Sequence, residues 1–321
     1  MRAANSHAQE EVLRVLDFFA ENKGKRVVLG QHTQTMEQEE LKYIREITGK
    51  LPALCGFELL SYSPNIDYTN SDEECLLEVG NARGTLKKAW EWARMGGLLT
   101  FTWHWFSPMY GCGKSFFSAN TEFDAKRAVT CGTDEYRAFM SDMDYMAGLL
   151  RPFCDAHIPI LWRPFHESEG DWFWWGHQDK SVVQKLYRMM FDRYVNHFHL
   201  DNLIWVYNSP NPACFPGDDV VDIVSRDMYP PEHEHTARAQ EYKELAGFTD
   251  DSHIYAIAET GTLPDVDAIA AENIPWSYYM TWSKSFCMSE QYTDNAQLIK
   301  TYQSDNAITL DRLPGLYKVK E

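Results

Sequence analysis

One short part of the chain combines acidic and aromatic side chains in a pattern that could do chemistry. It consists of Trp162–Glu167 followed at once by Asp171–Gly176, with three tryptophans among four consecutive residues. Indole rings stack on the apolar face of a sugar ring while the indole N–H stays available as a donor. The pattern therefore predicts a carbohydrate site in which the Glu167 carboxyl acts on a glycosidic bond. The alternative is an aromatic core cluster capped by a chance glutamate, but so many polar side chains would be costly to bury in a core.

A second carboxyl in a similar setting is that of Glu259, which ends the apolar run Tyr255–Ala258 and precedes Thr260-Gly261. Cleavage of a glycosidic bond needs two carboxyl groups, one protonated and one ionised. Taken alone, Glu259 could equally be a capping or surface carboxylate. Together with Glu167 it predicts the second half of such a pair.

The elements that must position these residues alternate between strand-like and helical patterns, which predicts a parallel sheet. Eight strands are expected, and this number together with the length of 321 residues favours one (β/α)8 TIM barrel as a single domain over residues 1–321. The predicted strands are Arg26–Leu29, Ala53–Phe57, Leu98–Trp103, Ile158–Arg163, Leu203–Tyr207, Val221–Asp227, Ile254–Ala258 and Trp276–Thr281. The rival, a doubly wound open sheet, lacks a GxGxxG turn after its first strand.

Helical patterns fill the intervals between most of these strands, although the Pro-rich link between the fifth and sixth strands makes a helix there doubtful. The predicted helices are Gln38–Thr48, Leu76–Met95, Asp134–His157, Lys180–Phe198, Ala237–Ala246, Val266–Ala271 and Asn295–Gln303. Polar or aromatic residues recur just past the strand ends, which a barrel brings together on one face. These residues are Gln31, His32, Glu58, His104, Trp105, His166, Glu167, Asn208, Asp227, Tyr229, Glu259 and Trp282.

The overall composition limits the class of partner. Aromatic residues make up 14% of the chain and the formal net charge is −17. Nucleic acids and anionic membranes need a basic surface, so neither is expected as a partner. The seven cysteines include no CxxC pair and cannot all pair within one chain, so free thiols are favoured, although Cys112 and Cys131 could be bridged.

No long apolar run predicts a transmembrane helix, and the location of the protein in the cell stays open. The stretch Glu232–His235 could suggest metal ligands, but it has no matching cluster and is expected to be a solvated loop. We therefore expect neither a metal nor a cofactor, and we expect a monomer.

The motifs together resemble glycoside hydrolase family 26, most of whose members are endo-β-1,4-mannanases. The resemblance takes in Gly30-Gln31, Thr102–Trp105, Trp162–Glu167, Gly170–Gly176, Pro216–Asp219, Val221–Ile223, Asp227–Tyr229, the Glu259 strand and Thr281–Ser283, and so spans nearly the whole chain. In the wider clan the residue before the acid is usually Asn, whereas this family carries His, and this chain has His166. One departure is Ser168, where many relatives have a bulkier apolar residue.

Carried over by position, the resemblance implies that Glu167 is the acid/base and Glu259 the nucleophile of a retaining barrel enzyme. Tyr229 would hold Glu259. His104 and His166 would hydrogen-bond the sugar, and the axial 2-hydroxyl of mannose is one candidate partner for them. His166 could instead be a core histidine. The aromatic residues expected to contact the substrate are Trp172 in a neighbouring subsite, Trp282 under the cleaved ring, Trp105 and Trp175.

These expectations predict a retaining endo-β-1,4-mannanase that acts on a β-mannan oligo- or polysaccharide. The two carboxyl groups should then lie about 5–5.5 Å apart, not the roughly 6.5–9.5 Å of inverting enzymes. A β-1,3-xylanase or a mixed-linkage β-glucanase of the same family is the alternative within the class. Other classes are a glycan-binding barrel without catalysis, which would need neither glutamate, and a metal-dependent hydrolase or deacetylase.

Overall fold

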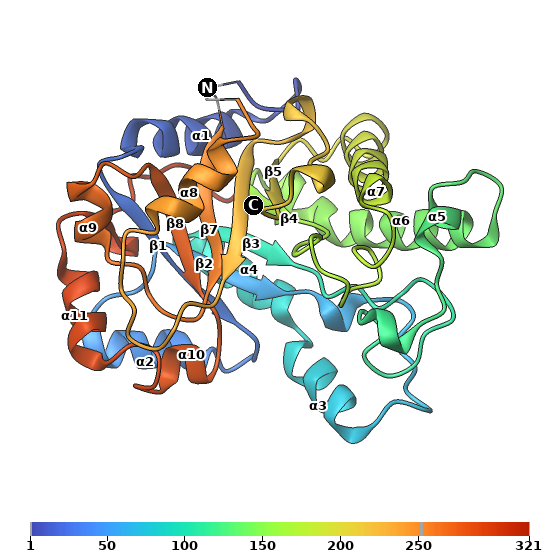
Figure 1. The fold of residues 1–321 in the computed structure, drawn as a ribbon, viewed down its shortest axis with the longest axis horizontal. Coiled ribbons are helices and arrows are strands. Elements are labelled where there is room, and N and C mark those ends of the chain that lie inside the picture. Colours follow the sequence, from blue (N-terminus) through green and yellow to red (C-terminus); the bar gives the residue numbers. More distant parts are fainter. Residues whose placement is uncertain (1, 251–252, 321) are drawn as a thin grey trace.

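The computed structural model describes residues 2–250 and 253–320. Eight parallel strands close into a barrel, because β1 pairs with both β2 and β8 (Figure 1). The strands are β1 (Val27–Thr33), β2 (Leu54–Glu58), β3 (Leu98–Thr102), β4 (Ile160–Arg163), β5 (Leu203–Asn208), β6 (Ile223–Met228), β7 (Ile254–Thr260) and β8 (Trp276–Thr281). A short ninth strand, β9 (Ala307–Ile308), pairs in parallel with the first two residues of β1. The fold is therefore the (β/α)8 barrel that the sequence predicts.

Helices cover the outside of the barrel, as Figure 1 shows. They are α1 (Glu10–Asn22), α2 (Glu39–Thr48), α3 (Glu73–Ala82), α4 (Thr85–Arg94), α5 (Ala125–Ala128), α6 (Asp134–Asp155), α7 (Lys180–Asp192), α8 (Ala239–Ala246), α9 (Val266–Ala271), α10 (Ser285–Met288) and α11 (Asn295–Gln303). Between β5 and β6 the structure has short 3-10 turns at Pro212–Cys214 and Asp218–Val220, which agrees with the doubt that the Pro-rich link raised about a helix.

The strands are buried on both faces, as expected of a parallel sheet covered by helices. Every residue of β1 and of β7 is buried, which explains why these segments read as apolar runs. In β6 burial decreases toward the end of the strand, where Arg226, Asp227 and Met228 are only partly covered. The carboxyl end of β6 is therefore more open to solvent than its start.

The helices differ from the predicted ones in several places. The predicted helix Leu76–Met95 is two helices, α3 and α4, because Arg83 is extended and Gly84 adopts a left-handed φ of 94°. The predicted helix Lys180–Phe198 is α-helical only to Asp192 and ends in a π-helical turn at Arg193–His197. Helices α1, α5 and α10 were not predicted from the sequence.

Helix α1 precedes the first strand and packs against β7 and β8. Val12, Val15, Leu16 and Phe19 are buried along one of its faces, at the spacing of an amphipathic helix. The Gln9 backbone N–H before α1 donates to the Asp201 carbonyl, just before β5 begins, at 2.9 Å. The helix therefore lies at the amino end of the strands, opposite their carboxyl ends (Figure 1).

Two predictions about the whole chain can be compared with the structure. All seven cysteines are free, which agrees with the preference for free thiols over a bridge between Cys112 and Cys131. Within the described residues, no helix combines the length and the apolar character needed to cross a bilayer.

Candidate active site

Glu167 lies in the turn that follows β4. Phe165 and Glu167 both have a left-handed φ of 51°, which turns the chain sharply after the strand. The Glu167 backbone N–H donates to Asn208 Oδ1 at 2.9 Å, and this bond ties the turn to the end of β5. Because such a backbone conformation is unfavourable for residues other than glycine, its occurrence at an acidic residue is typical of a functional turn.

Trp172, which follows the same turn, packs closely against Gly170, and Gly176 lies next to Gly170. Trp172 Nε1 donates to Glu167 Oε2 at 2.8 Å, and the indole ring lies against Gly170, where an added Cβ would come within 2.2 Å of the ring. An added Cβ on Gly176 would lie 2.5 Å from the Gly170 carbonyl oxygen. Gly170 therefore leaves the space that the Trp172 indole occupies, and Gly176 leaves room for the Gly170 carbonyl.

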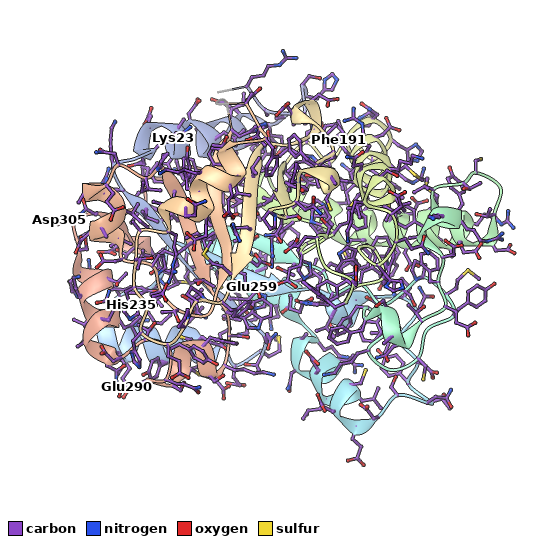
Figure 2. The ribbon with its side chains drawn as sticks, viewed as in Figure 1. Lys23, Phe191, His235, Glu259, Glu290 and Asp305 are labelled. Carbon is purple, nitrogen blue, oxygen red and sulfur yellow. The ribbon has the colours of Figure 1, made fainter. Side chains whose placement is uncertain are left out.

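Glu259 lies near the end of β7, where Figure 2 marks it at the point to which the strands converge. The register between β6 and β7 shifts at this point: Arg226 pairs with Ile257, but Asp227 pairs with Glu259. Such a bulge redirects side chains at a strand end. Here it places the Glu259 and Asp227 carboxyls side by side at the mouth of the barrel.

Arg163, the last residue of β4, is the cation between these two carboxyls. It is fully buried, and it donates from Nη1 to Asp227 Oδ2 at 2.6 Å and from Nη2 to Glu259 Oε2 at 2.9 Å. Nη2 also donates to Thr102 Oγ1 at 2.9 Å. The Tyr229 hydroxyl donates to the other Glu259 oxygen, Oε1. Glu259 therefore has a donor on each carboxylate oxygen.

Three carboxyl groups meet at this point. One oxygen each from Glu167, Asp227 and Glu259 lies within 4.8 Å of the other two. Asn208 joins them, because its amide donates to Asp227 Oδ1 at 2.8 Å while its carbonyl accepts the Glu167 backbone N–H. Arg163 supplies one positive charge between Asp227 and Glu259, which offsets part of the negative charge of the three carboxyls.

This crowding raises the pKa of the carboxyls. Burial, followed by the negative charge of Asp227, raises the pKa of both Glu167 and Glu259, to about 7 in the case of Glu167. At Glu259, Arg163 and the Tyr229 hydroxyl act in the opposite direction. At Glu167, the hydrogen bond from Trp172 lowers the pKa, and the charge of Arg163 lowers it further. Burial and the Glu259 charge raise the pKa of the Tyr229 phenol, which keeps it a donor.

Two histidines contact each other beside the carboxyls. His104 Nδ1 lies 2.7 Å from Glu58 Oε2, and His104 Nε2 lies 3.3 Å from His166 Nε2. Burial opposes charge on His104, but the buried Glu58 outweighs it and raises the pKa of His104. Burial, Arg163 and His104 lower the pKa of His166. A His104 ring protonated on both nitrogens would donate to Glu58 and to His166, so the direction of the His104–His166 contact depends on the protonation of His104.

The comparison with known protein families identifies the family of this chain. The family model for glycosyl hydrolase family 26 matches residues 4–312. The chain belongs to this family. The match covers every strand of the barrel and all the residues described above.

Relatives in glycosyl hydrolase family 26 resemble the chain over nearly its whole length. The mannan endo-1,4-beta-mannosidase of Thermothelomyces thermophilus is 33% identical over 98% of this chain and 64% of its own length. Mannan endo-1,4-beta-mannosidase B of Piromyces is 31% identical over 97% of this chain and 53% of its own length. The chain thus spans between about half and two thirds of these relatives.

Solved structures of the family share the fold. The Podospora anserina GH26-CBM35 beta-(1,4)-mannanase superposes with a TM-score of 0.88 at 29% identity, covering 98% of this chain and 69% of its own. The beta-mannanase from a symbiotic protist of the termite Reticulitermes speratus, complexed with gluco-manno-oligosaccharide, has a TM-score of 0.86 at 28% identity. That alignment covers 98% of this chain and 97% of the protist enzyme.

The structure places the predicted site residues of this family member in two groups. Trp172 and Tyr229 are 45% and 47% exposed, and both contact a carboxyl of the pair. Trp282 is partly exposed and stacks on His32, with ring centroids 3.9 Å apart. These residues, with the partly exposed His104, surround Glu167 and Glu259 and can face a ligand.

Trp105 and Trp175 belong to the second group, and the prediction that they contact the substrate needs correction. Both are fully buried. Trp105 Nε1 donates to Asp142 Oδ2 at 2.8 Å, and Trp175 Nε1 donates to the His166 carbonyl at 2.8 Å. Their ring faces are covered by other aromatic rings, so they support the wall of the site from behind and offer no surface to a sugar.

His166 also lies deeper than expected. Its side chain is buried, its Nε2 faces His104, and its Nδ1 has no hydrogen-bond partner among the described residues. This position fits a residue that orients His104 at least as well as one that contacts the sugar. The alternative of a core histidine, stated from the sequence, therefore stays open for His166.

Sequence reasoning noted four of these residues without assigning them a role: Arg163, Asp227, Asn208 and Glu58. Each lies at a strand end, and that was the only signal available. The partners of Arg163 come from β3, β6 and β7, and no local pattern reveals that they meet. The side chains of Glu232–His235 turn to different partners, such as Gln291 for Glu232 and the Leu263 carbonyl for His235.

Proposed function

We propose that the chain is a retaining endo-β-1,4-mannanase, with Glu167 as acid/base and Glu259 as nucleophile. The observation that carries the proposal is the close approach of the two carboxyls, with oxygens within 4.8 Å, at the carboxyl ends of β4 and β7. Retaining enzymes hold their carboxyls about 5–5.5 Å apart, whereas inverting enzymes need roughly 6.5–9.5 Å to admit a water. The names of the family relatives given above supply the substrate class, a β-1,4-mannan.

In the first step, a Glu259 oxygen attacks the anomeric carbon while the bond from that carbon to the leaving oxygen breaks. Glu167 gives its proton to the leaving oxygen, so the product departs as a neutral alcohol. In the second step, Glu167 takes a proton from water, and the water oxygen displaces Glu259 from the sugar. Two inversions at one carbon retain the β-configuration.

The contacts support a proton on Glu167, and not on Glu259, before the first step. Glu259 accepts hydrogen bonds from both Arg163 and Tyr229, and donors of this kind favour the ionised form. Glu167 accepts one bond, from the neutral Trp172 indole, at its side chain. Because the two groups repel each other's charge, a proton shared by the pair resides on Glu167 and leaves Glu259 ionised.

A panel of polysaccharides tests the proposed function directly. We expect reducing-sugar release from mannan and glucomannan, and a β-anomer as the first product detected by NMR. Preferred hydrolysis of β-1,3-xylan or lichenan would replace the substrate assignment by one of the alternatives within the family. Binding to mannan without hydrolysis would favour a glycan-binding barrel, and an α-anomer as first product would overturn the retaining mechanism.

The raised pKa of Glu167 predicts the alkaline side of the pH profile. The acid must be protonated to assist departure, so on its alkaline side kcat/KM should fall as the pH rises through about 7. A profile of kcat/KM on mannooligosaccharides measures this limb. An aryl β-mannoside with a good leaving group is the control, because its departure needs no proton. An unchanged alkaline limb on that substrate would contradict the role of Glu167.

Replacement of Trp172 by Phe should move the same limb. The indole N–H stabilises the ionised Glu167 carboxyl, and phenylalanine keeps an aromatic face but cannot donate. The limb should shift upward by on the order of one pH unit, since a hydrogen bond to a charged group contributes about 1.5–3 kcal/mol and one pKa unit is about 1.36 kcal/mol. Paired pH profiles of the two enzymes measure the shift. A limb that stays in place would show that the indole does not act on Glu167.

A further inference from the structure

Glu58, the last residue of β2, is a buried carboxyl group that the proposed mechanism does not use. Its Oε1 accepts the backbone N–H of Leu60 at 2.9 Å and the backbone N–H of His104 at 3.0 Å. Its Oε2 lies 2.7 Å from His104 Nδ1. One carboxyl group therefore holds both the backbone and the ring of His104.

The surrounding structure keeps the His104 ring in this position. Glu58 pairs with Thr102 in the register of β2 and β3, and His104 follows two residues later, beside the end of β2. The rings of Phe116 and Phe173 pack edge-on against the imidazole, with centroids 5.2 and 5.4 Å from its own. The side chain of His104 is only 16% exposed, so the ring has little room to turn away from Glu58.

The second ring nitrogen of His104 is directed toward the wall of the site, where Nε2 lies 3.3 Å from His166 Nε2. A neutral imidazole carries one proton, so a His104 ring that donates from Nδ1 to Glu58 would have none on Nε2. A ring with a proton on each nitrogen donates to Glu58 and to the site at once. The charge of His104 therefore determines what its site-facing nitrogen can do.

Glu58 provides a reason for His104 to be charged. A buried carboxylate is costly unless a cation pairs with it. Among the described residues, His104 is the one basic side chain within 4.0 Å of Glu58. The dominant influence on the pKa of His104, burial, lowers it, but the charge and the hydrogen bond of Glu58 together raise it above its usual value.

Charged groups on other strands also act on His104. The charge of Glu259 on β7 raises the pKa of His104, and the charge of Arg163 on β4 lowers it. The influence is mutual, because a charged His104 favours the ionised form of Glu259. It acts in the same direction on Asp227 of β6.

The two neighbouring histidines do not compete for this charge. Burial, followed by the charges of Arg163 and His104, lowers the pKa of both His32 on β1 and His166 well below the usual range. Both rings are therefore neutral at pH 7, and a neutral His166 can accept a hydrogen bond at Nε2. Of the three rings, only His104 has an acidic partner in contact with it.

We propose that Glu58 is a positioning residue that keeps His104 charged, with a proton on each ring nitrogen, so that Nε2–H is a fixed donor at the wall of the site. The proposal rests on the proposed function, since it takes His104 to face the sugar held between Glu167 and Glu259. Glu58 acts through His104 and takes no part in bond cleavage. The charge on His104 supports the ionised form of Glu259.

The backbone determines what Glu58→Gln would do. Two N–H groups, those of Leu60 and His104, point at the position of Oε1, so the amide oxygen of the glutamine must lie there. Its NH2 group then faces His104 Nδ1 and donates to it. His104 becomes a neutral ring with its proton on Nε2. The variant therefore removes the charge and keeps the Nε2 donor.

NMR of the histidine ring nitrogens tests the charge without turnover. At pH 7 both nitrogens of His104 should carry protons in the wild-type protein, and only Nε2 should carry one in Glu58→Gln. Loss of the signal in His104→Gln assigns it. A neutral His104 in the wild-type protein overturns the proposal, even where Glu58→Gln fails to fold. An unchanged ring in a folded Glu58→Gln overturns it as well.

A second glutamate–histidine pair supplies the matched control. Glu11 on α1 is buried, and its Oε2 lies 3.0 Å from His157 Nδ1 at the amino end of the barrel. Glu11→Gln makes the same chemical change away from the site. It should leave the His104 signal and kcat/KM as they are in the wild-type protein. A change of the His104 ring in this variant would overturn the assignment of the charge to Glu58.

Kinetics test what the charge does. In Glu58→Gln, kcat/KM on mannooligosaccharides should fall roughly 10–100-fold, the scale of one hydrogen bond to a charged group. The acid limb of the pH profile should move to higher pH, because Glu259 loses a neighbouring cation and its pKa rises. A fall in kcat/KM with the acid limb in place would show a structural role only and overturn the proposal. Failure of the proposed function is distinct, because the wild-type enzyme would then not hydrolyse mannan.

Discussion

Glu259→Ala is expected to lower kcat on mannooligosaccharides on the order of 10⁴-fold or more, the scale seen when a nucleophile is removed. Without this carboxyl no covalent intermediate can form, whatever the leaving group. Glu167→Ala should be as damaging on natural substrates but should spare the first step on an aryl β-mannoside, so that the intermediate accumulates. Intact-mass analysis during turnover measures this difference.

Azide separates the two roles by stereochemistry. In Glu259→Ala it can replace the nucleophile and give an α-mannosyl azide after one inversion. In Glu167→Ala it can attack the intermediate and give the β-mannosyl azide after two. Glu272→Ala, at an exposed glutamate just after α9, is the control and should retain full activity. Equal behaviour of the two variants on the aryl substrate, with no intermediate, would contradict the assignment of the carboxyls.

The positions of these carboxyls were predictable because they depend on local patterns. A run of buried apolar residues followed by a turn identifies a strand end, and β4 and β7 end close to the predicted residues. A barrel then brings all strand ends to one face regardless of their separation along the chain. The resemblance to the family added the roles, and these are still proposals for the individual residues.

The direction of each aromatic ring was not predictable in the same way. Trp105 and Trp172 both follow a strand in an aromatic stretch, yet Trp105 is 2% exposed and Trp172 is 45% exposed. The difference depends on tertiary contacts: Trp105 packs on Trp103 and Phe139, while Trp172 lies on the backbone of Gly170. Aromatic density therefore predicts a wall but not which of its rings face the ligand.

Backbone conformation accounts for the remaining differences. A helical pattern continues across Arg83 and Gly84, but the left-handed φ of 94° at Gly84 divides it into α3 and α4. Similarly, only the register shift between β6 and β7 reveals that Asp227 faces Glu259, since the pairing joins residues far apart in sequence.

Because Asp227 and Glu259 are paired in this way, Arg163 can bond both carboxyls. Its loss should therefore affect both folding and chemistry. Arg163→Met keeps much of the side-chain volume but leaves Asp227 and Glu259 as buried carboxylates without a cation. We expect the free energy of unfolding to fall by about 3–5 kcal/mol at neutral pH, the cost of breaking a buried ion pair by removing one partner. We also expect kcat to fall sharply, because Glu259 would then hold a proton at neutral pH.

The pH dependence of this loss distinguishes charge from packing. Without Arg163 the folded-state pKa of both carboxyls rises further above the unfolded value, so the folded variant binds protons that the unfolded chain releases. Its stability deficit should therefore grow as the pH rises through the raised pKa values and shrink at pH 5. Denaturant unfolding of both proteins at pH 5 and pH 8 measures this. Adding Asp227→Asn to Arg163→Met should recover part of the stability, because one of the two uncompensated charges is then absent. A deficit of equal size at both pH values, without recovery in the double variant, would mean that Arg163 contributes packing and not charge, and that the ionisation of Glu259 depends on Tyr229 instead.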